Sequence, residues 1–423
     1  MVLNSPRGTT DIYGKHLDYR NYIIDKSKQQ FLFFNYEQII TPAFEHSEVF
    51  SRSIGQSTDI VQKEMYTFQD KKGRSLTLRP EGTASVVRAV IENKMYAQNL
   101  PLKLFYVGNM FRYERPQKGR MREFCQLGVE AVGSNNPLID AEVIWLANTL
   151  FKQLGFKDLN LLINSIGCSS CRQEYMKIFR SFVEPRLENL CNDCKQRFKT
   201  NPLRIFDCKN SRCIARLEDS PKISDHLCDQ CSDHLKRVTG YLQQLGINFK
   251  LEPGLVRGFD YYTRTIFELT SRQLDSAQNA LGGGGRYDNL IEQMGGPQLP
   301  ALGFAIGVDR TMLLMQQLGI EPGYQSGQSK IYVASMDDKF SGYILEILSC
   351  LRNYFVCDTN FDIKNISKEL KWAEKKGFDY VLIVGESEFQ GKLVTIKDLK
   401  KFKQYSYDWK HDRDKIIELL RGN

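Results

Sequence analysis

The chain has no apolar run that approaches the length of about 20 residues needed to span a bilayer. Its first residues, MVLNSPRGTTDIYG, lack the apolar core of a secretory signal. The composition, 42% hydrophobic and 26% charged, is typical of a soluble globular protein. From these absences we expect a cytoplasmic protein without a membrane partner.

The chain also lacks a strong excess of charge of either sign. Its 58 basic and 50 acidic side chains leave a net charge of +8. Such a modest basic excess is compatible with a polyanionic partner, but many proteins without one share it. The length of 423 residues predicts two or three domains with a sizeable core.

A third absence concerns the four successive glycines at residues 282–285. No Lys-Ser or Lys-Thr pair follows them, so they are not the phosphate-binding loop of a P-loop protein. Because glycine has no Cβ, a run of glycines lets the backbone approach a ligand or another strand closely. We expect such a close approach here.

The clearest pattern in the chain is an alternation of period two between Val107 and Gly133. It predicts a hairpin, because alternate side chains of a strand point to opposite faces. The second arm has one wholly apolar face, made of Cys125, Leu127, Val129 and Ala131, and an opposite face made of Phe124, Gln126, Gly128 and Glu130.

The loop between the arms is basic and carries Arg115, Lys118, Arg120 and Arg122. Polar groups in an apolar strand indicate a ligand-binding face, and the planar fork of an arginine such as Arg112 suits phosphate oxygens. The alternative is an ordinary amphipathic hairpin with a solvated polar face.

The hairpin sequence FRYERPQKGRMREFCQ resembles the second signature motif of class II aminoacyl-tRNA synthetases, in the form found in histidyl-tRNA synthetases of the bacterial type. Residues 40–50 resemble the first class II motif, residues 257–265 the histidine-specific motif, and residues 301–319 the third class II motif. The motifs follow the family's order, and the resemblance covers nearly the whole chain. It implies an α+β fold, in which a class II antiparallel sheet is flanked by helices.

The composition changes at residue 168, because eight of the eleven cysteines fall within residues 168–235 among charged, helically patterned sequence. The resemblance implies a helical insertion here, at about residues 168–240. Beyond a Gly- and Pro-rich linker, strands alternate with helices, which predicts a mainly parallel α/β domain. We therefore predict an interrupted catalytic domain at residues 1–325 and a C-terminal domain at residues 326–423 that resembles the family's anticodon-binding domain.

The lysines of this C-terminal domain allow two interpretations. Lys364, Lys368, Lys371, Lys375 and Lys376 share one helix face or its approach. They could contact phosphates, or they could form an ordinary solvated helix face.

The cysteines of the insertion form three CxxC pairs: Cys168 with Cys171, Cys191 with Cys194, and Cys228 with Cys231. Cys208 and Cys213 lie between the last two pairs. This spacing is typical of structural zinc held by thiolates. The resemblance implies no need for zinc, so we favour reduced cysteines, some packed as small hydrophobes. Structural zinc at the three pairs remains the alternative.

The resemblance implies a histidine–tRNA ligase. Such an enzyme uses ATP with Mg²⁺ to convert L-histidine to histidyl-adenylate and pyrophosphate, and then transfers histidine to the 3′ end of tRNA(His). Negative charge accumulates as the carboxylate attacks the α-phosphate, so this chemistry depends on positioning and cationic groups. The family also implies a homodimer with Pro42 at its interface, although on local sequence alone Pro42 is a strand-terminating proline.

The resemblance assigns roles to individual residues, with Arg112 and Arg257 as the catalytic cations. The predicted histidine-binding residues are Glu81, Gly82, Thr83, Arg112, Gln126, Glu130, Arg257, Tyr261, Tyr262 and Tyr287. The predicted ATP-binding residues are Arg112, Glu114, Arg120, Phe124 and Arg310, and Gln117 is predicted near the acceptor end of the tRNA.

Local sequence supports some of these roles and leaves others open. Thr83 is a good N-cap for the following helix. Glu81 is placed to meet an ammonium group, or else it lies solvated in a helix-capping turn. Met121 and Cys125 depart from residues common in the family; Cys125 lies on the apolar face and should not touch the chemistry.

Competing functions fit parts of the sequence. A non-catalytic paralogue that regulates a phosphoribosyltransferase usually lacks the motif at residues 257–265 and the C-terminal domain, and this chain keeps both. The intact cations Arg112, Arg257 and Arg310 argue against a module that only binds tRNA. A class II synthetase for proline or threonine would lack Glu130 and Tyr262, the candidates for pairing with the two imidazole nitrogens.

Overall fold

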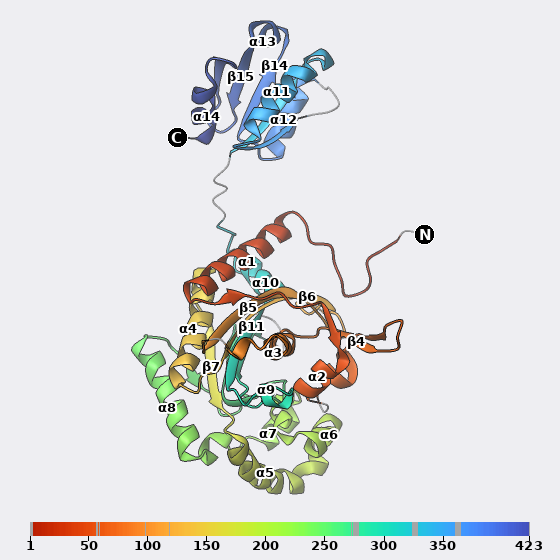
Figure 1. The fold of residues 1–423 in the computed structure, drawn as a ribbon, viewed down its shortest axis with the longest axis vertical. Helices are drawn as coiled ribbons and strands as arrows, with labels where there is room; N and C mark the ends of the chain where they lie inside the picture. The colour runs from red at the N-terminus through yellow and green to blue at the C-terminus, as the bar shows by residue number, and fades with distance from the viewer. Residues whose placement is uncertain are drawn as a thin grey trace. The chain divides into compact units, whose positions relative to one another are not determined.

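The computed structural model describes residues 3–55, 58, 60–97, 99–117, 119–271, 273, 279–323, 329–359 and 365–422. The chain forms two compact units, Met1–Pro322 and Gly323–Asn423, drawn in Figure 1. The boundary predicted from the sequence, between residues 325 and 326, lies shortly after this division. Within the described part of the chain, no helix is both long and apolar enough to cross a bilayer.

The first unit is built on a sheet of eight strands in the order β1-β5-β6-β11-β10-β9-β7-β8. Its strands are β1 (Glu37–Gln38), β5 (Leu102–Phe111), β6 (Glu123–Val132), β7 (Asn160–Ser165), β8 (Lys250–Leu251), β9 (Thr263–Thr270), β10 (Ala280–Arg286) and β11 (Ala301–Gly307). All neighbours run antiparallel except β1 with β5 and β7 with β8. The predicted antiparallel sheet is confirmed, with the predicted hairpin as β5 and β6.

One face of this sheet is covered by α1 (Lys15–Phe33), α4 (Pro137–Gln153), α8 (Asp229–Gln244) and α10 (Val308–Gln317). The apolar side chains Cys125, Leu127, Val129 and Ala131 of β6 point into this core, as the alternation predicts. α4 begins with Pro137 after an N-cap, because the Asn136 side chain accepts a hydrogen bond from the N–H of Leu138.

The opposite face of the sheet carries the second core, with α3 (Thr83–Glu92) and α9 (Leu290–Gln293). A small sheet of β2 (Phe44–His46), β4 (Ser75–Leu78) and β3 (Thr67–Gln69) lies in the same part of the chain. The N-terminal part of the first unit also contains three short helices, α2 (Ser47–Ser53), η1 (Ile60–Glu64) and η2 (Met95–Ala97).

The predicted helical insertion joins β7 to β8 and gathers at one end of the first unit (Figure 1). It contains α5 (Ser169–Val183), η3 (Glu184–Asn189), α6 (Asn192–Thr200), η4 (Pro202–Asp207), α7 (Ser211–Arg216), η5 (Ile223–His226) and α8. Its buried side chains Tyr175 and Phe179 belong to the same apolar cluster as Tyr261 and Tyr262. The insertion therefore shares a core with the site described below.

The second unit contains a five-stranded sheet in the order β13-β12-β14-β15-β16. Its elements are β12 (Lys330–Ser335), η6 (Asp338–Phe340), α11 (Ser341–Leu351), β13 (Val356–Thr359), α12 (Ile366–Lys375), β14 (Tyr380–Val384), α13 (Glu386–Gly391), β15 (Leu393–Asp398), β16 (Lys403–Asp408) and α14 (Arg413–Arg421).

The expectation of a mainly parallel sheet in this unit is wrong. β12 pairs in parallel with β13 and β14, but β14–β15 and β15–β16 are antiparallel. Only the short helix α13 separates β14 from β15, and a parallel crossover needs about a dozen residues or more. Lys368, Lys371, Lys375 and Lys376 are exposed on or beside α12, and Lys364 lies outside the described residues.

Candidate functional site

A cavity of about 580 Å³ lies in the first unit, on the sheet face opposite the apolar side of β6. Its walls come from β6, β9, β10 and β11, from the start of α3 and from the loop that precedes β9. It brings together most of the predicted site residues: Glu81, Thr83, Arg112, Glu114, Arg120, Phe124, Gln126, Glu130, Arg257, Tyr261, Tyr262, Tyr287 and Arg310.

Glu130 lies on β6 and is 1% exposed. One carboxylate oxygen accepts a hydrogen bond from the Thr83 hydroxyl at 2.7 Å, and the other accepts one from the Tyr287 hydroxyl. Burial raises the pKa of Glu130 to about 8. Gly303 leaves room for this carboxylate, because a Cβ there would lie 2.0 Å from Glu130 Oε2.

Glu81 is also buried, and its carboxylate accepts the backbone N–H groups of Thr83 at 2.6 Å and Ala84 at 2.7 Å. These bonds cap α3, so the expectation that Thr83 is the N-cap is wrong, and so is the alternative of a solvated Glu81. The longer side chain of Glu81 reaches both free N–H groups, which leaves the Thr83 hydroxyl for Glu130. Burial raises the pKa of Glu81, and the two N–H bonds oppose that rise.

Gln126 follows on the same face of β6 as Glu130. Its Oε1 atom is buried and has no hydrogen-bond partner among the described residues. A buried acceptor without a partner is costly, so it points to a ligand donor at this position. Gln126, Glu81 and Thr83 thus offer three oxygen acceptors to the cavity.

Arg112 follows β5 and lies against aromatic rings. Its guanidinium carbon is 5.3 Å from the ring centre of Phe124 and 5.9 Å from that of Phe259, and its Nε donates to the Pro80 carbonyl at 2.9 Å. Burial lowers the pKa of Arg112, and the positive charge of nearby Arg257 lowers it further. The two predicted catalytic cations are therefore close enough to repel each other.

Two further arginines continue this cationic region. Burial and repulsion from Arg120 and Arg112 lower the pKa of Arg310, which heads α10 and donates to the carbonyl of Ala280 at 2.7 Å. Arg120 pairs with the buried carboxylate of Glu114, which also lies 3.9 Å from Arg112. The carboxylates of Glu64 and Glu268 also act on these arginines, so the region gathers several guanidinium groups with acidic partners beside them.

Arg257 forms an ion pair with Glu268 of β9, with 2.5 Å between its Nη1 and Oε1. The glycine run of β10 makes room for this arginine, because a Cβ on Gly283 would lie 2.9 Å from Arg257 Nη1. The backbone of β10 thus approaches both its neighbouring strands and the site, as the glycine run predicts.

Three tyrosines line the cavity near Glu130. The ring of Tyr261 lies 4.7 Å from that of Tyr262 and 5.7 Å from that of Tyr287, between ring centres. Burial raises the pKa of Tyr262, so its hydroxyl keeps its proton and can both donate and accept a hydrogen bond.

Two predicted site residues do not line the cavity. Gly82 lies beneath it, where a Cβ would come within 2.2 Å of the Tyr106 ring, so this glycine acts through close packing. Gln117 is exposed in a tight turn, where its N–H donates to the carbonyl of Arg120 at 3.0 Å.

Sequence reasoning missed several residues of the cavity, among them Glu268, Asp207 and Lys209. Glu268 is an acidic side chain in an apolar strand, the same signal that identified Glu130. Asp207 and Lys209 come from the insertion and carry no such signal. Met121 lines the cavity, whereas Cys125 is 2% exposed in the apolar core, as expected.

The six cysteines of the three CxxC pairs, which are the candidate zinc ligands, are free and are divided between two groups. Cys168 and Cys171 meet Cys228 and Cys231, whereas the pair Cys191 and Cys194 meets two cysteines outside any CxxC pair, Cys208 and Cys213.

Residues 8–311 match the family model of histidyl-tRNA synthetase, and residues 330–422 match that of an anticodon binding domain. The chain is 45% identical over 401 residues to the histidine–tRNA ligase of Halothermothrix orenii, a match that covers 95% of each chain. It is 42% identical to that of Clostridioides difficile, over 96% of each chain. The crystal structure of apo histidyl-tRNA synthetase from S. aureus has a TM-score of 0.83 and 34% identity, over 99% of this chain and 100% of that one.

Proposed function

The chain belongs to the histidyl-tRNA synthetase family, and on that premise we propose how its cavity works as an ATP-dependent histidine–tRNA ligase. One end of the cavity holds L-histidine, and the cationic end holds the phosphates of ATP. The observation that carries this proposal is a single cavity whose lining holds both buried oxygen acceptors and the guanidinium groups of Arg112, Arg120, Arg257 and Arg310.

The acceptors fit the α-amino group of histidine. A protonated amine has three donors, and Glu81, Thr83 and Gln126 supply three acceptors. Both oxygens of Glu81 already accept an N–H but keep a second lone pair for the amine. Because these acceptors are fixed by the start of α3 and by β6, histidine orders few protein groups when it binds.

The imidazole then reaches Glu130 and Tyr262. Glu130 is held by the hydroxyls of Thr83 and Tyr287, so its remaining lone pairs have a fixed direction toward one ring nitrogen. The Tyr262 hydroxyl serves the other nitrogen. Amino acids without both ring nitrogens leave a buried polar group unpaired, which is the basis for rejecting them.

In the activation step, the histidine carboxylate attacks the α-phosphorus of ATP, a phosphorus–oxygen bond forms, and pyrophosphate leaves. Arg112 and Arg257 stabilise the negative charge that grows at this centre. Arg310 and Arg120 bind the outer phosphates, and Phe124 with Glu114 seats the adenine. The cationic residues fit ATP with Mg²⁺, and the ion, when bound, offsets the charge of the outer phosphates.

In the second step, the terminal adenosine of tRNA(His) attacks the adenylate and AMP leaves. The exposure of Gln117 supports its proposed contact with the acceptor end, and the match of the second unit to an anticodon binding domain supports anticodon binding there. We place the enzyme in the cytoplasm as a homodimer. Ile40, two residues before Pro42, is 81% exposed and Phe44, two residues after it, is 50% exposed, which supports an interface at the first motif.

The first experiment is ATP–pyrophosphate exchange with each of the twenty amino acids in the presence of Mg²⁺. We expect exchange with histidine alone. Exchange with a different amino acid would keep the reaction class and overturn the roles of Glu130 and Tyr262. No exchange in a folded preparation would favour the regulatory or tRNA-binding alternatives.

A further inference from the structure

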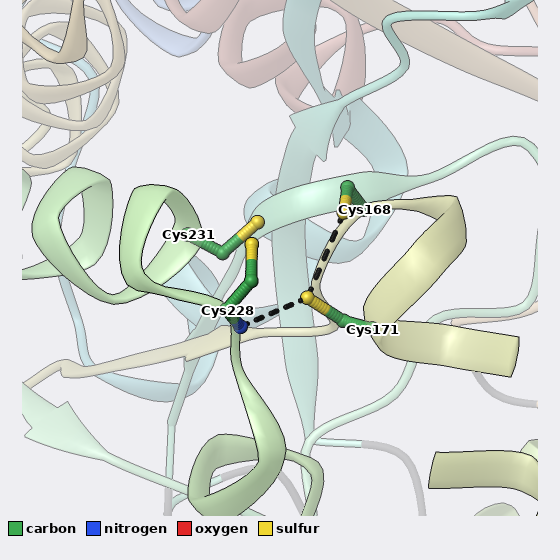
Figure 2. A group of neighbouring side chains, drawn as sticks. All are labelled: Cys168, Cys171, Cys228 and Cys231. Carbon is green, nitrogen blue, oxygen red and sulfur yellow. Dashed lines mark hydrogen bonds between the residues drawn. The ribbon is translucent and has the colours of Figure 1, made fainter. Parts of the chain in front are cut away.

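The insertion brings eight cysteines, which are spread over the sequence, into two groups of four. The first group is Cys168, Cys171, Cys228 and Cys231, and the second group is Cys191, Cys194, Cys208 and Cys213. In each group, all four sulfur atoms lie within 4.8 Å of one another. Figure 2 shows the sulfurs of the first group turned toward one another between the starts of α5 and α8.

We propose that each group binds one Zn²⁺ through four thiolates, so that the insertion carries two structural zinc ions. A zinc–sulfur distance of about 2.3 Å places tetrahedral ligands about 3.8 Å apart. The sulfurs of Cys168 and Cys171 are 3.6 Å apart, and those of Cys191 and Cys208 are 3.8 Å apart. These distances fit a shared ion and exceed the ~2.05 Å of a disulfide bond.

The convergence of the sulfurs argues against cysteines that serve only as small hydrophobes. Such residues pack against any apolar neighbour, and nothing in that role makes four sulfurs meet. Cys171, Cys194, Cys213 and Cys231 are each 2% exposed or less. The remaining cysteines, Cys125, Cys350 and Cys357, belong to neither group.

The backbone around the sulfurs is arranged for negative charge. The N–H of Cys228 donates to Cys171 Sγ at 3.2 Å, and in the second group the N–H of Cys191 donates to Cys213 Sγ at 3.3 Å. The N–H of Asn210 donates to Cys208 Sγ at 3.4 Å. Four thiolates on one Zn²⁺ leave a net charge of about −2, which such N–H groups disperse.

Helix starts add to this effect. Cys168, Cys191 and Cys228 are the N-caps of α5, α6 and α8. The N-terminal end of a helix carries partial positive charge and favours a thiolate over a thiol. Three independent helices thus direct their positive ends to these two groups.

The two groups also lie where links would stabilise the insertion. The first group joins the start of α5 to the start of α8, which are the first and last helices of the insertion. The second group joins α6, η4 and α7, which are six to nine residues long. Helices this short are marginal alone, and a bound metal supplies folding free energy directly.

The second group reaches the cavity through its neighbours in sequence. Asp207 and Lys209 line the cavity and flank Cys208, and the Asn201 side chain donates to Asp260 at 2.6 Å. Zinc at this group would therefore hold one wall of the site in place. The metal sites themselves do not depend on the proposed function.

The test is metal analysis of the full-length protein, purified without chelators. We expect about two equivalents of zinc per chain. Cys231→Ser and Cys194→Ser should each lose about one equivalent, whereas the matched control Cys350→Ser should keep both. Less than about half an equivalent in the unaltered protein overturns the proposal, iron in place of zinc overturns the choice of metal, and a single equivalent overturns one of the two groups.

If the cysteine variants fail to fold, the number of metal sites can still be measured on the unaltered protein. After removal of its metal with a chelator, the protein should be titrated with Co²⁺, which absorbs strongly in the visible region when four thiolates hold it in a tetrahedron. We expect this absorption to saturate at two equivalents and to disappear when Zn²⁺ is added. An absence of the thiolate absorption contradicts the proposal, whatever the exchange activity of the same preparation.

Discussion

The two proposed ends of the cavity differ in the charged groups that they present. At the end proposed for histidine, Glu130 is held by two hydroxyls and Glu81 by two backbone N–H groups. At the end proposed for phosphates, Arg112 and Arg120 repel Arg310, and Glu114, Glu64 and Glu268 offset part of this positive charge. The histidine end thus presents carboxylates held in fixed directions, and the phosphate end presents guanidinium groups that lie close enough to repel one another.

This difference suits two different tasks. Recognition of one amino acid needs acceptors with fixed directions, because a misplaced polar partner discriminates poorly. Stabilising a phosphoryl-transfer transition state needs positive charge that is already in place when negative charge grows. Removing a cation should therefore affect the reaction rate most, and removing an acceptor partner should affect histidine affinity most.

The largest expected effect follows from Arg257→Ala. We expect the rate of histidine-dependent exchange to fall at least ~100-fold, which is the scale of a lost transition-state donor. The loss should be in kcat, and the fold should be retained because Arg257 is at the cavity wall. A matched control is Arg180→Ala, which removes a guanidinium that donates within the insertion, to the Phe198 carbonyl. Near-normal exchange by the Arg257 variant would remove this residue from the mechanism.

A smaller effect, confined to the other end, is expected from Glu130→Ala. Loss of a charge-assisted hydrogen bond to the imidazole should raise the KM for histidine by ~10- to 100-fold while the KM for ATP stays nearly constant. Tyr287→Phe keeps the carboxylate but removes one hydroxyl that positions it, and should give an intermediate value. An unchanged histidine KM in Glu130→Ala would contradict the proposed role.

The reciprocal experiment is Arg310→Ala, which removes one cation from the phosphate end. The remaining guanidinium groups repel one another less, so the stability of the fold should not decrease. The KM for ATP should rise about 10-fold, because one cation that binds the phosphates is lost. The histidine KM should remain within about twofold of its original value. Equal changes in both constants would mean that the two ends do not act separately.

Sequence alone predicted the parts of this site that depend on local patterns. The alternation in the hairpin separates Gln126 and Glu130 from Cys125 and Leu127, because a strand with one buried face imposes it. Alternation assigns no face to residues 257–262, because the chain turns there before β9 begins at Thr263.

The remaining contacts depend on residues distant in sequence. Thr83 meets Glu130, which lies 47 positions further along the chain, so its hydroxyl could not be assigned from the helix start alone. Cys208 and Cys213 belong to no CxxC pair, and only the fold shows that they meet Cys191 and Cys194. Spacing identifies candidate ligands, but tertiary structure decides their grouping.

The smallest expected effect concerns the stability of the free enzyme and tests whether Glu130 is held as the structure indicates. Burial raises the pKa of Glu130 to about 8 in the folded protein, above its ordinary value near 4.5. The folded state thus binds this proton more tightly, and the contribution is fully present below pH 4.5 and is lost as the pH rises through 8. Glu130→Gln carries no such proton. The melting temperature of the unaltered protein should therefore fall relative to that of Glu130→Gln by about 2 °C per pH unit between pH 6 and 8.

Saturating histidine sharpens this last experiment. A ring N–H that donates to Glu130 favours the carboxylate and lowers its pKa, so the difference in slope between the two proteins should shrink when histidine is bound. ATP alone should leave the slope unchanged, because it occupies the cationic end. If ATP and histidine flatten the slope equally, Glu130 does not belong to the histidine end, and the proposed division of the cavity into a histidine end and a phosphate end fails with it.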